Sequence, residues 1–490
     1  MSEALSDARR LHPATLLVRW LRIVPQMLAG GIGLAATASE QGWSRFLIFA
    51  AVAMGVGGLF VLLSWWRFTY RVGAGEIVIE KGILQRQRRV IPFDRVQDIA
   101  IERRLLARLT GTAKVKIETG GAAKDEGSLD VIALADAQEM RDLVRRGGVA
   151  VVATREAVAV TEAEPVLFAM DIKRLLLSGL FGFSLIFLAA AGAAVQQLDQ
   201  FGLVEWDDLI TQERAQAARG MVNAQLVFLL AALVIGLGVV AGVVRTVARD
   251  FGFRLTRAEA GLRRKRGLFT LSEVVIPIRR TQVALIESGP VARWFGWYAL
   301  SFQTLGADQK EGGVQVAAPF ARMDEILPIL AEAGFPAPPP RGEFHGVPRR
   351  ALLRQASPLL LLAALAAGGA FLVDFRAGFA AAALLAASVY VVLRWRKHGH
   401  ALDEVALFVS GGLLRRRLWV VPFEKAQTIR LARGPLQRGL GLASLLVDTA
   451  GASTMRSPEM VDLDGDEADA LALRLLELFH RRRATVANRY

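Results

Sequence analysis

Cysteine is absent from the 490 residues of this chain, and histidine is scarce, with five residues. Without cysteine the chain can form no disulfide, thiolate-bound zinc, iron–sulfur cluster or cysteine nucleophile. Only His398 and His400 lie close together in the sequence, and because no further ligand is near them we expect no histidine-based metal centre. No Walker A motif, Ser-His-Asp set or cluster of catalytic carboxylates occurs. The sequence therefore predicts a protein that is not an enzyme and that uses no cofactor or metal.

Charged residues are missing from six long apolar stretches, although the whole chain has 60 Lys and Arg against 46 Asp and Glu. The hydrophobic content of 53% is concentrated in these stretches, which are 17 to 25 residues long. A helix needs ~20 apolar residues to cross a hydrocarbon core of ~30 Å. We therefore expect six membrane-spanning helices in three hairpins, at residues 23–39, 46–66, 175–198, 220–244, 355–373 and 377–393.

Basic residues flank the outer ends of each predicted hairpin, whereas the connections inside the hairpins contain few of them. Arg349 and Arg350 precede the fifth span, for example, and Arg396 and Lys397 follow the sixth. Because Lys and Arg near span ends stay in the cytoplasm, we expect both termini and the large loops to be cytoplasmic in a bacterial inner membrane. No predicted span contains an ionisable residue, which disfavours a proton or ion pathway.

The segments that follow the three predicted hairpins share five positions at fixed spacing. A glycine is followed after ten residues by a proline, and after five more by a glutamine; an arginine and a glycine lie 16 and 19 residues beyond the proline. Identical spacing in three copies indicates an internal triplication. The positions are Gly82, Pro92, Gln97, Arg108 and Gly111 in the first copy, Gly267, Pro277, Gln282, Arg293 and Gly296 in the second, and Gly412, Pro422, Gln427, Arg438 and Gly441 in the third. A structural role is the expected one for all of them, including the repeated glutamine.

Each repeated segment has the pattern of short strands followed by one helix. Residues 76–80 and the residues after Gly82 predict two strands joined by a glycine turn, and residues 114–118 alternate between apolar and charged side chains. Helical patterns end the copies at 135–146, 322–333 and 465–483. The repeated unit is therefore predicted to be a small β-sandwich or barrel closed by a C-terminal helix.

This order of elements, the Gly-Pro-Gln spacing and the predicted hairpins together resemble the YdbT-like bacterial membrane proteins. Members of that family carry repeated bacterial pleckstrin-homology-like (bPH2) domains behind helical hairpins, and the resemblance covers nearly the whole chain. It implies a pleckstrin-like β-barrel with a C-terminal helix, no cofactor and no settled activity, with a loose link to envelope stress and antimicrobial resistance. We expect a polytopic α-helical membrane protein with six spans in three hairpins and three cytoplasmic α+β pleckstrin-like β-barrel domains.

The domain boundaries follow from the alternation of hairpins and repeats. The predicted parts are an N-terminal segment with the first hairpin (1–66), the first PH-like domain (67–165), the second hairpin (166–249), the second PH-like domain (250–335), a Pro- and Gly-rich linker (336–349), the third hairpin (350–397) and the third PH-like domain (398–490).

Clusters of basic residues lie beside the glycine of each repeat. In a pleckstrin-like barrel an early hairpin loop is a common place for lipid-headgroup contacts, and each base near an anionic leaflet contributes about 1 kcal/mol. These residues are candidate contacts for anionic lipid or a partner, or they only set the topology. They are Arg86, Arg88, Arg89, Arg263, Arg264, Lys265, Arg266, Arg415, Arg416 and Arg417. The clusters contain no interleaved aromatic residues, so we expect no binding to nucleic acid.

The sequence thus predicts a non-enzymatic integral membrane scaffold or envelope-maintenance and stress-resistance protein. Its expected partners are the lipid bilayer, anionic phospholipid and another membrane protein. The alternative is a component of a membrane export or transport system for lipid or peptide, regulated by its PH-like domains.

Overall fold

The computed structural model describes residues 8–16, 18–20, 42–73, 75–83, 85–119, 127–147, 164–182, 224–259, 261–304, 313–372, 377–449 and 458–487. The chain forms two compact units. Unit 1 comprises Met1–Ala163, Ala169–Arg254 and Arg264–Val274, and unit 2 comprises Glu164–Phe168, Leu255–Arg263 and Val275–Tyr490.

The prediction of a six-span helical membrane protein is wrong. About 37% of the described residues lie in strands, which form four sheets. Among these residues only two helical segments are long and apolar enough to cross a membrane, Arg350–Ala370 and Gly378–Trp395. They belong to helices α12 (Arg350–Leu372) and α13 (Ala377–Trp395), at the predicted fifth and sixth spans.

The other four predicted spans have different outcomes. The first, 23–39, lies outside the described residues, and the third is described only to residue 182 and holds the nine-residue helix α5 (Ile172–Leu180). Predicted spans two and four fall in α2 (Gly42–Trp66) and α9 (Ala224–Asp250). In α2 the apolar segment found is the shorter Met54–Trp66. Absence of charge identifies an apolar stretch, but spanning also requires an unbroken apolar helix of ~20 residues, which α5 does not form.

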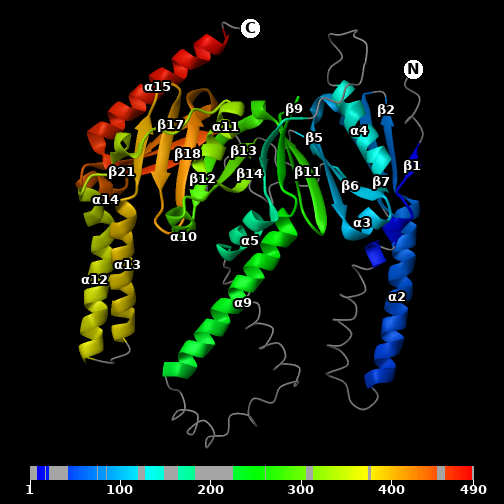
Figure 1. The fold of residues 1–490 in the computed structure, drawn as a ribbon, viewed down its shortest axis with the longest axis horizontal. Helices are drawn as coiled ribbons and strands as arrows, with labels where there is room; N and C mark the ends of the chain where they lie inside the picture. The colour runs from blue at the N-terminus through cyan, green and yellow to red at the C-terminus, as the bar shows by residue number, and fades with distance from the viewer. Residues whose placement is uncertain are drawn as a thin grey trace, which may run out of the picture. The chain divides into compact units, whose positions relative to one another are not determined.

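The three repeats share one order of elements, namely three strands, a 3-10 turn, a strand, a short helix, two strands and a C-terminal helix (Figure 1). The first contains β2 (Thr69–Gly73), β3 (Glu76–Lys81), β4 (Gln87–Pro92), η1 (Phe93–Arg95), β5 (Val96–Arg104), α3 (Leu105–Leu109), β6 (Thr112–Thr119), β7 (Ser128–Ala133) and α4 (Leu134–Gly147). The second contains β9 (Arg254–Ala258), β10 (Gly261–Arg266), β11 (Thr270–Ile276), η2 (Ile278–Arg280), β12 (Thr281–Ser288), α10 (Pro290–Trp294), β13 (Tyr298–Thr304), β14 (Val314–Ala321) and α11 (Met323–Glu332). The third contains β16 (Gly399–Leu402), β17 (Ala406–Gly411), β18 (Arg416–Pro422), η5 (Phe423–Lys425), β19 (Ala426–Ala432), α14 (Pro435–Gly439), β20 (Leu442–Thr449), β21 (Glu459–Asp464) and α15 (Gly465–Ala487).

A short strand from before each predicted hairpin joins the repeat that follows it. These strands are β1 (Arg9–Arg10), β8 (Val166–Ala169) and β15 (His345–Gly346), which lie beside β2, β9 and β16. In unit 1 the strand β1 is held by Arg9, whose Nη1 donates to Asp136 Oδ1 on α4 at 2.8 Å, and Tyr70 donates to the other oxygen of that carboxylate. Strands of two to four residues are too short to show a period of two in the sequence, so no pattern there predicts them.

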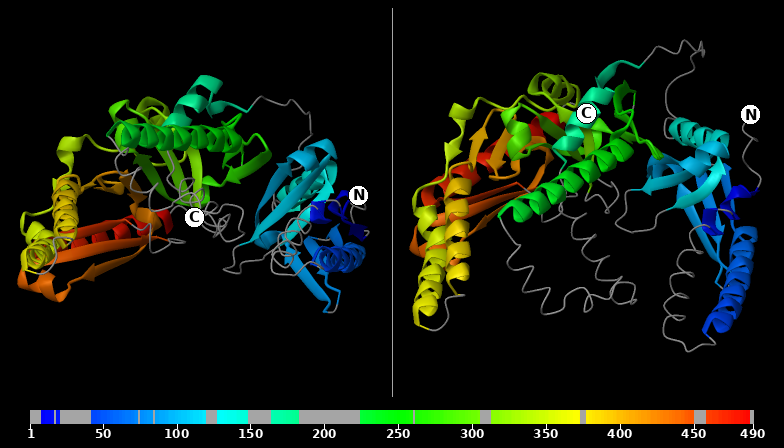
Figure 2. Two further views of the ribbon diagram at one scale, coloured as in Figure 1. Left: turned by 90° about the horizontal axis from the view of Figure 1, so that it is seen from below. Right: turned by 60° about the horizontal axis from the view of Figure 1, so that its bottom comes forward.

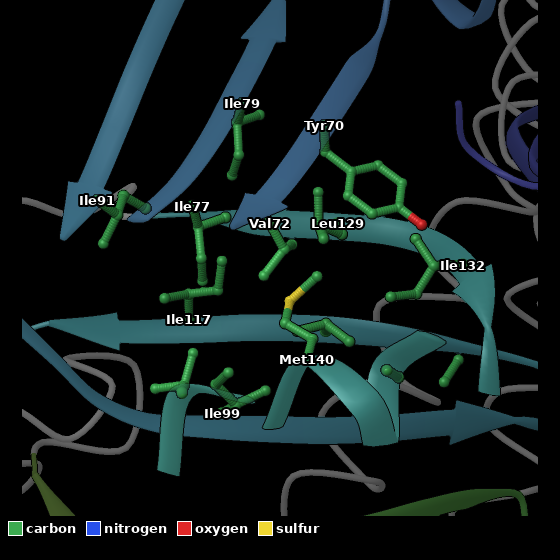
Figure 3. Packing of buried hydrophobic residues seen from close by; sticks show 14 of the residues in the cluster. Tyr70, Val72, Ile77, Ile79, Ile91, Ile99, Ile117, Leu129, Ile132 and Met140 are labelled. Carbon is green, nitrogen blue, oxygen red and sulfur yellow. The ribbon is translucent and has the colours of Figure 1, made fainter. Parts of the chain in front are cut away.

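The first repeat closes one core between the sheet β1-β2-β3-β4, the strands β5-β6-β7 and helix α4. Branched side chains from both sets of strands, such as Ile77, Ile79 and Ile117, point inward and meet Met140 of α4 (Figure 3). Strand residues alternate between core and surface, so every second residue supplies this layer. The third repeat in unit 2 has an equivalent core, in which Leu471 and Leu475 of α15 cover β17 to β21.

Neighbouring repeats are joined by strand pairing in one conserved register. In unit 1, β5 pairs with β11 so that Ile101 lies opposite Glu273. In unit 2, β12 pairs with β18 so that Ile286 lies opposite Leu418, the same pair of repeat positions. The strands that correspond to these at the two ends, β4 and β19, are the outer strands of their sheets among the described strands.

Candidate functional site

The first arginine cluster lies on the outer strand β4 and the turn before it. Arg86, Arg88 and Arg89 are all exposed. The Nε atom of Arg88 lies 3.7 Å from a carboxylate oxygen of Glu80 on β3, a surface pair that contributes about 1 kcal/mol or less. This cluster therefore presents positive charge to solvent along a sheet edge.

The third cluster lies at the start of β18 and is organised by one carboxylate. Arg415 and Arg417 each donate to Glu287 of β12 at 2.9 Å, which ties the second and third repeats together within unit 2. Arg416 is half-buried, and burial, assisted by the nearby charges of Arg341 and Arg293, lowers the pKa of its guanidinium. Arg416 also donates to the hydroxyl of Ser410 at 3.5 Å, so all three arginines have a partner within unit 2, with Arg415 still largely exposed.

The second cluster is mostly internal. Arg264 and Arg266 are buried in β10, and Arg266 donates to the buried carboxylate of Asp250 at the end of α9 at 3.1 Å. Arg263 forms an ion pair with Glu164 at 2.8 Å, so Lys265 is the exposed member of the cluster. Alternation along the strand explains the difference, since Arg264 and Arg266 point to one face and Lys265 to the other.

The repeated glycine is required by the turn between the second and third strands. Gly82, Gly267 and Gly412 have φ angles of 114°, 117° and 86°. A Cβ atom at these positions would lie 1.8, 1.9 and 2.1 Å from the carbonyl oxygen three residues further on. Only glycine fits such a turn without strain. Gly111, Gly296 and Gly441 also have positive φ, after the short helix.

The repeated proline and glutamine mark the corner between the two sheets. Pro92, Pro277 and Pro422 end the third strand or follow it directly, and each precedes a 3-10 turn. In the strand that follows, the pairing with the next strand skips the glutamine in all three copies. The skip lies between Val96 and Asp98, between Thr281 and Val283, and between Ala426 and Thr428. Gln97, Gln282 and Gln427 are therefore β-bulge residues, and a bulge bends a strand where a sheet turns a corner.

The repeated arginine lies in the short helix, exposed in the first and third copies. Arg108 Nη1 donates to the carbonyl oxygen of Leu268, in the glycine turn of the next repeat, at 3.0 Å. Arg293 and Arg438 occupy the same place in α10 and α14. In the first copy the position is therefore at the junction with the next repeat.

The end of the α12–α13 hairpin is fixed to the third repeat by a buried carboxylate that sequence reasoning missed. Asp462 on β21 is 0% exposed and has a φ of 60°. It accepts hydrogen bonds from Arg354 at 2.6 Å and Gln355 at 2.5 Å, both on α12, and from Gln437 of α14 at 2.7 Å. No motif marks Asp462 in the sequence, since its ligands lie 25 to 108 residues away.

Tryptophans complete the connection at the ends of the helices. Trp395 at the end of α13 donates to the carbonyl of Pro348 at 3.2 Å, and Trp65 near the end of α2 donates to the carbonyl of Leu11 at 2.9 Å. Each indole thus binds the chain to the segment that precedes its hairpin. Within the described ranges, no group of three or more His, Asp and Glu side chains is placed to hold a metal ion.

These features define a protein built from tandem pleckstrin-like units. A family profile described as "Bacterial PH domain" matches residues 21–147, 193–333 and 357–479, and because these ranges cover more than half of the chain, the chain belongs to this family. It is similar to the UPF0699 transmembrane protein YdbT of Bacillus subtilis (strain 168), with 25% identity over 382 residues, 71% of this chain and 74% of that protein. No solved structure matches it significantly. The resemblance inferred from the sequence is confirmed.

Proposed function

We propose that this protein is a non-enzymatic, multi-pass scaffold of the bacterial inner membrane that holds its PH-like domains at the cytoplasmic face. The similarity to a protein named as transmembrane supports a membrane location. The α12–α13 hairpin supplies a crossing, and its two spans leave the segment before the hairpin and the third PH-like domain on the same side. We propose the cytoplasmic side for that domain and for both termini.

The observation that carries this proposal is the apolar surface of α12 and α13 combined with their polar attachment to the third repeat. The two helices lie side by side in every view (Figures 1 and 2). Large apolar side chains such as Leu361, Leu365 and Phe379 are more than half exposed along them. A helix that is apolar on its outward side needs a lipid or protein environment. The polar contacts of Arg354 and Gln355 with Asp462, in contrast, gather at the end next to the PH-like domain.

The orientation follows from the basic residues around the hairpin. Arg349, Arg350 and Arg354 lie at its start, and Arg394, Arg396 and Lys397 lie at its end. Lys and Arg near the ends of spans stay on the cytoplasmic side, so the third repeat belongs there.

The arginines of the first and third clusters are the proposed contacts for anionic lipid. Arg86, Arg88, Arg89 and Arg415 present positive charge to solvent, whereas the buried members Arg264 and Arg266 serve the fold. Each exposed base contributes about 1 kcal/mol near an anionic leaflet, so the contacts would orient domains that the hairpin already holds at the membrane. Another membrane protein is the further proposed partner of the scaffold.

Cysteine labelling tests the membrane topology, because the natural chain contains no cysteine. A single cysteine in place of Phe375, in the hairpin connection outside the described residues, should react with an impermeant maleimide in spheroplasts. A cysteine in place of the exposed Glu404 should react only after the membrane is permeabilised. Equal labelling of both positions before permeabilisation, or extraction of the protein from membranes by carbonate, would overturn the proposed anchorage.

Energy transfer tests the lipid contact. The full chain, labelled at position 404 and placed in nanodiscs that contain a lipid-bound acceptor, should show higher transfer with anionic lipid and less as salt rises, because the Debye length falls from ~10 Å at 0.1 M to ~3 Å at 1 M. Changing Arg86, Arg88, Arg89 and Arg415 to Ser should remove this dependence. The same dependence in the variant would show that these arginines do not bind lipid.

A further inference from the structure

Large apolar side chains are exposed on α10, the short helix that connects the paired strands β12 and β13 of the second repeat. In α10, Val291 is 46% exposed and Trp294 is 81% exposed. The nearby Trp297 is packed against the domain. Its ring stacks on that of Phe320, with 4.3 Å between the ring centroids, and the guanidinium carbon of Arg322 lies 4.7 Å from the centroid of the Trp297 ring. The fold thus accommodates one indole in the domain and leaves the other outside it.

The strand order of unit 2 places α10 at the end of the sheets that adjoins the hairpin. Strand β16 begins four residues after α13 and runs away from it, and the antiparallel β17 returns, so the turn at 412–415 lies at the hairpin end. Ser288, just before α10, pairs with Arg416, just after that turn. Figure 1 shows α10 and α14 at the end of the sheets from which α12 and α13 extend.

Further exposed apolar side chains lie at this same end. Leu414 in the turn is 60% exposed and Leu436 in α14 is 64% exposed. The helix α14 adjoins the hairpin directly, because Arg350 at the start of α12 donates to the carbonyl of Leu440 and the two segments share a small apolar cluster. Each of these three segments also contains an arginine, namely Arg293 in α10, Arg415 in the turn at 412–415 and Arg438 in α14.

Unit 1 repeats the arrangement independently. Leu105 and Leu109 of α3 are exposed, and so is Phe269 in the glycine turn that follows β10. Arg108 connects these two parts through its hydrogen bond to the Leu268 carbonyl. The strands β2 and β3 run away from α2 and back again, as β16 and β17 do from α13. Exposed apolar side chains with an arginine between them are therefore a feature of the repeat and not of one loop.

Aromatic and aliphatic side chains beside arginines suit the membrane interface, where rings and hydrocarbon lie below the phosphates and guanidinium groups lie among them. We propose that the short helices α10 and α14 and the turn at 412–415 insert Val291, Trp294, Leu414 and Leu436 into the lipid interface, with α3 and Phe269 doing so in unit 1. This inference rests on the membrane anchorage proposed above. It adds that the PH-like domains are seated in the bilayer by apolar insertion, in addition to electrostatic attraction.

Spin labels on the full chain in nanodiscs can measure this insertion. Single cysteines at Val291, Leu436, Leu385 and Glu404 would each carry a nitroxide, and the positions are already exposed, so labelling disturbs no core packing. Leu385 on α13 reports the anchorage, and Glu404, in the turn at the other end of β16, is the control. The readout is the collision rate with oxygen relative to that with a water-soluble nickel chelate.

We expect this ratio to be high at positions 385, 291 and 436 and low at 404. Replacing Trp294 and Leu414 by Asp should lower the ratio at 291 and leave that at 385 unchanged, whereas Trp294→Phe should change neither. A low ratio at 385 would remove the proposed anchorage. A high ratio at 385 with low ratios at 291 and 436 would refute the insertion of the short helices and leave the proposed anchorage standing. If the low ratios rose only on addition of a membrane extract, a protein partner and not lipid would cover this surface.

Discussion

The contact between the hairpin and the third PH-like domain depends on the carboxylate of Asp462, and Asp462→Asn tests it. The side chain is fully buried and accepts three hydrogen bonds, from Arg354, Gln355 and Gln437. Asparagine tolerates the positive φ of this position, so the substitution removes charge without adding backbone strain. It also replaces one acceptor oxygen by an NH2 group, which cannot accept from the surrounding donors, and it leaves Arg354 without its counter-charge.

Loss of one partner of a buried ion pair costs about 3–5 kcal/mol, and because Arg354 is 29% exposed, water offsets part of this, so we expect about 3 kcal/mol. For a cooperative unit of 150–250 residues, 1 kcal/mol lowers the Tm by about 2–4 °C, which gives a decrease of about 6–12 °C. The assay is thermal unfolding of the full chain in mild detergent, followed by near-UV circular dichroism.

A matched control lies two residues away. Asp464 pairs with Arg350, but both side chains are partly exposed, and such a pair contributes about 1 kcal/mol or less. Asp464→Asn should therefore lower the Tm by less than about 4 °C. In a double-mutant cycle, Arg354→Met and Asp462→Asn should be non-additive by about 1–3 kcal/mol. Equal effects of the two aspartate substitutions, or strict additivity in the cycle, would refute the argument.

Three further predictions concern the turn, the buried histidine and the sheet edges. Gly412→Ala should destabilise the third repeat by about 1–3 kcal/mol because its Cβ would meet the Arg415 carbonyl, whereas Gly439→Ala, with open space at its Cβ, should be nearly neutral in the same unfolding assay. Burial, together with the nearby His345 and His398, lowers the pKa of His400 to about 4, below about 6.5 in the unfolded chain. The fold then loses up to about 3 kcal/mol through His400 as the pH falls through that interval, and Tm measured against pH should show this loss. His400→Gln should reduce the loss to the part that comes from His398, whose pKa burial also lowers, despite Glu467 at 3.9 Å from the His400 ring. Suppose that β4 of one copy paired with β19 of another in the register of the β12–β18 pair. Arg89 and Arg86 would then face Arg430 and Arg433, and because like charges repel, we expect this pairing to be unfavourable. Changing Arg430 and Arg433 to Glu should produce concentration-dependent association in light scattering, and additional Arg86→Glu and Arg89→Glu changes should reverse it; association of the unmodified chain through these edges would contradict the prediction.

The triplication was determined by the sequence itself, because the fold places strict local demands on its repeated residues. A turn with φ near 100° accepts only glycine, a strand that ends at a 3-10 turn accepts proline, and the bulge position recurs at the glutamine. Such demands act within a few residues, so they remain visible as spacing. The strand-rich repeat with its C-terminal helix could be predicted for the same reason.

The number of spans could not be determined in this way. Charge-free runs predicted six spans, whereas the described residues give two. At the third predicted span, for example, the helix α5 ends after nine residues, and composition does not show whether one helix continues through an apolar stretch. The charges at 263–266 were predicted to share one role, yet alternation along β10 buried Arg264 and Arg266 and exposed Lys265.

Only the tertiary structure decided the relations between distant segments. The pairing of β12 with β18, the two-residue strand β15 and the ligands of Asp462 join residues that are tens to more than a hundred positions apart. No local period records such contacts. Their energy comes from strand pairing and from hydrogen bonds to a buried charge, both of which exist only after the chain has brought those segments together.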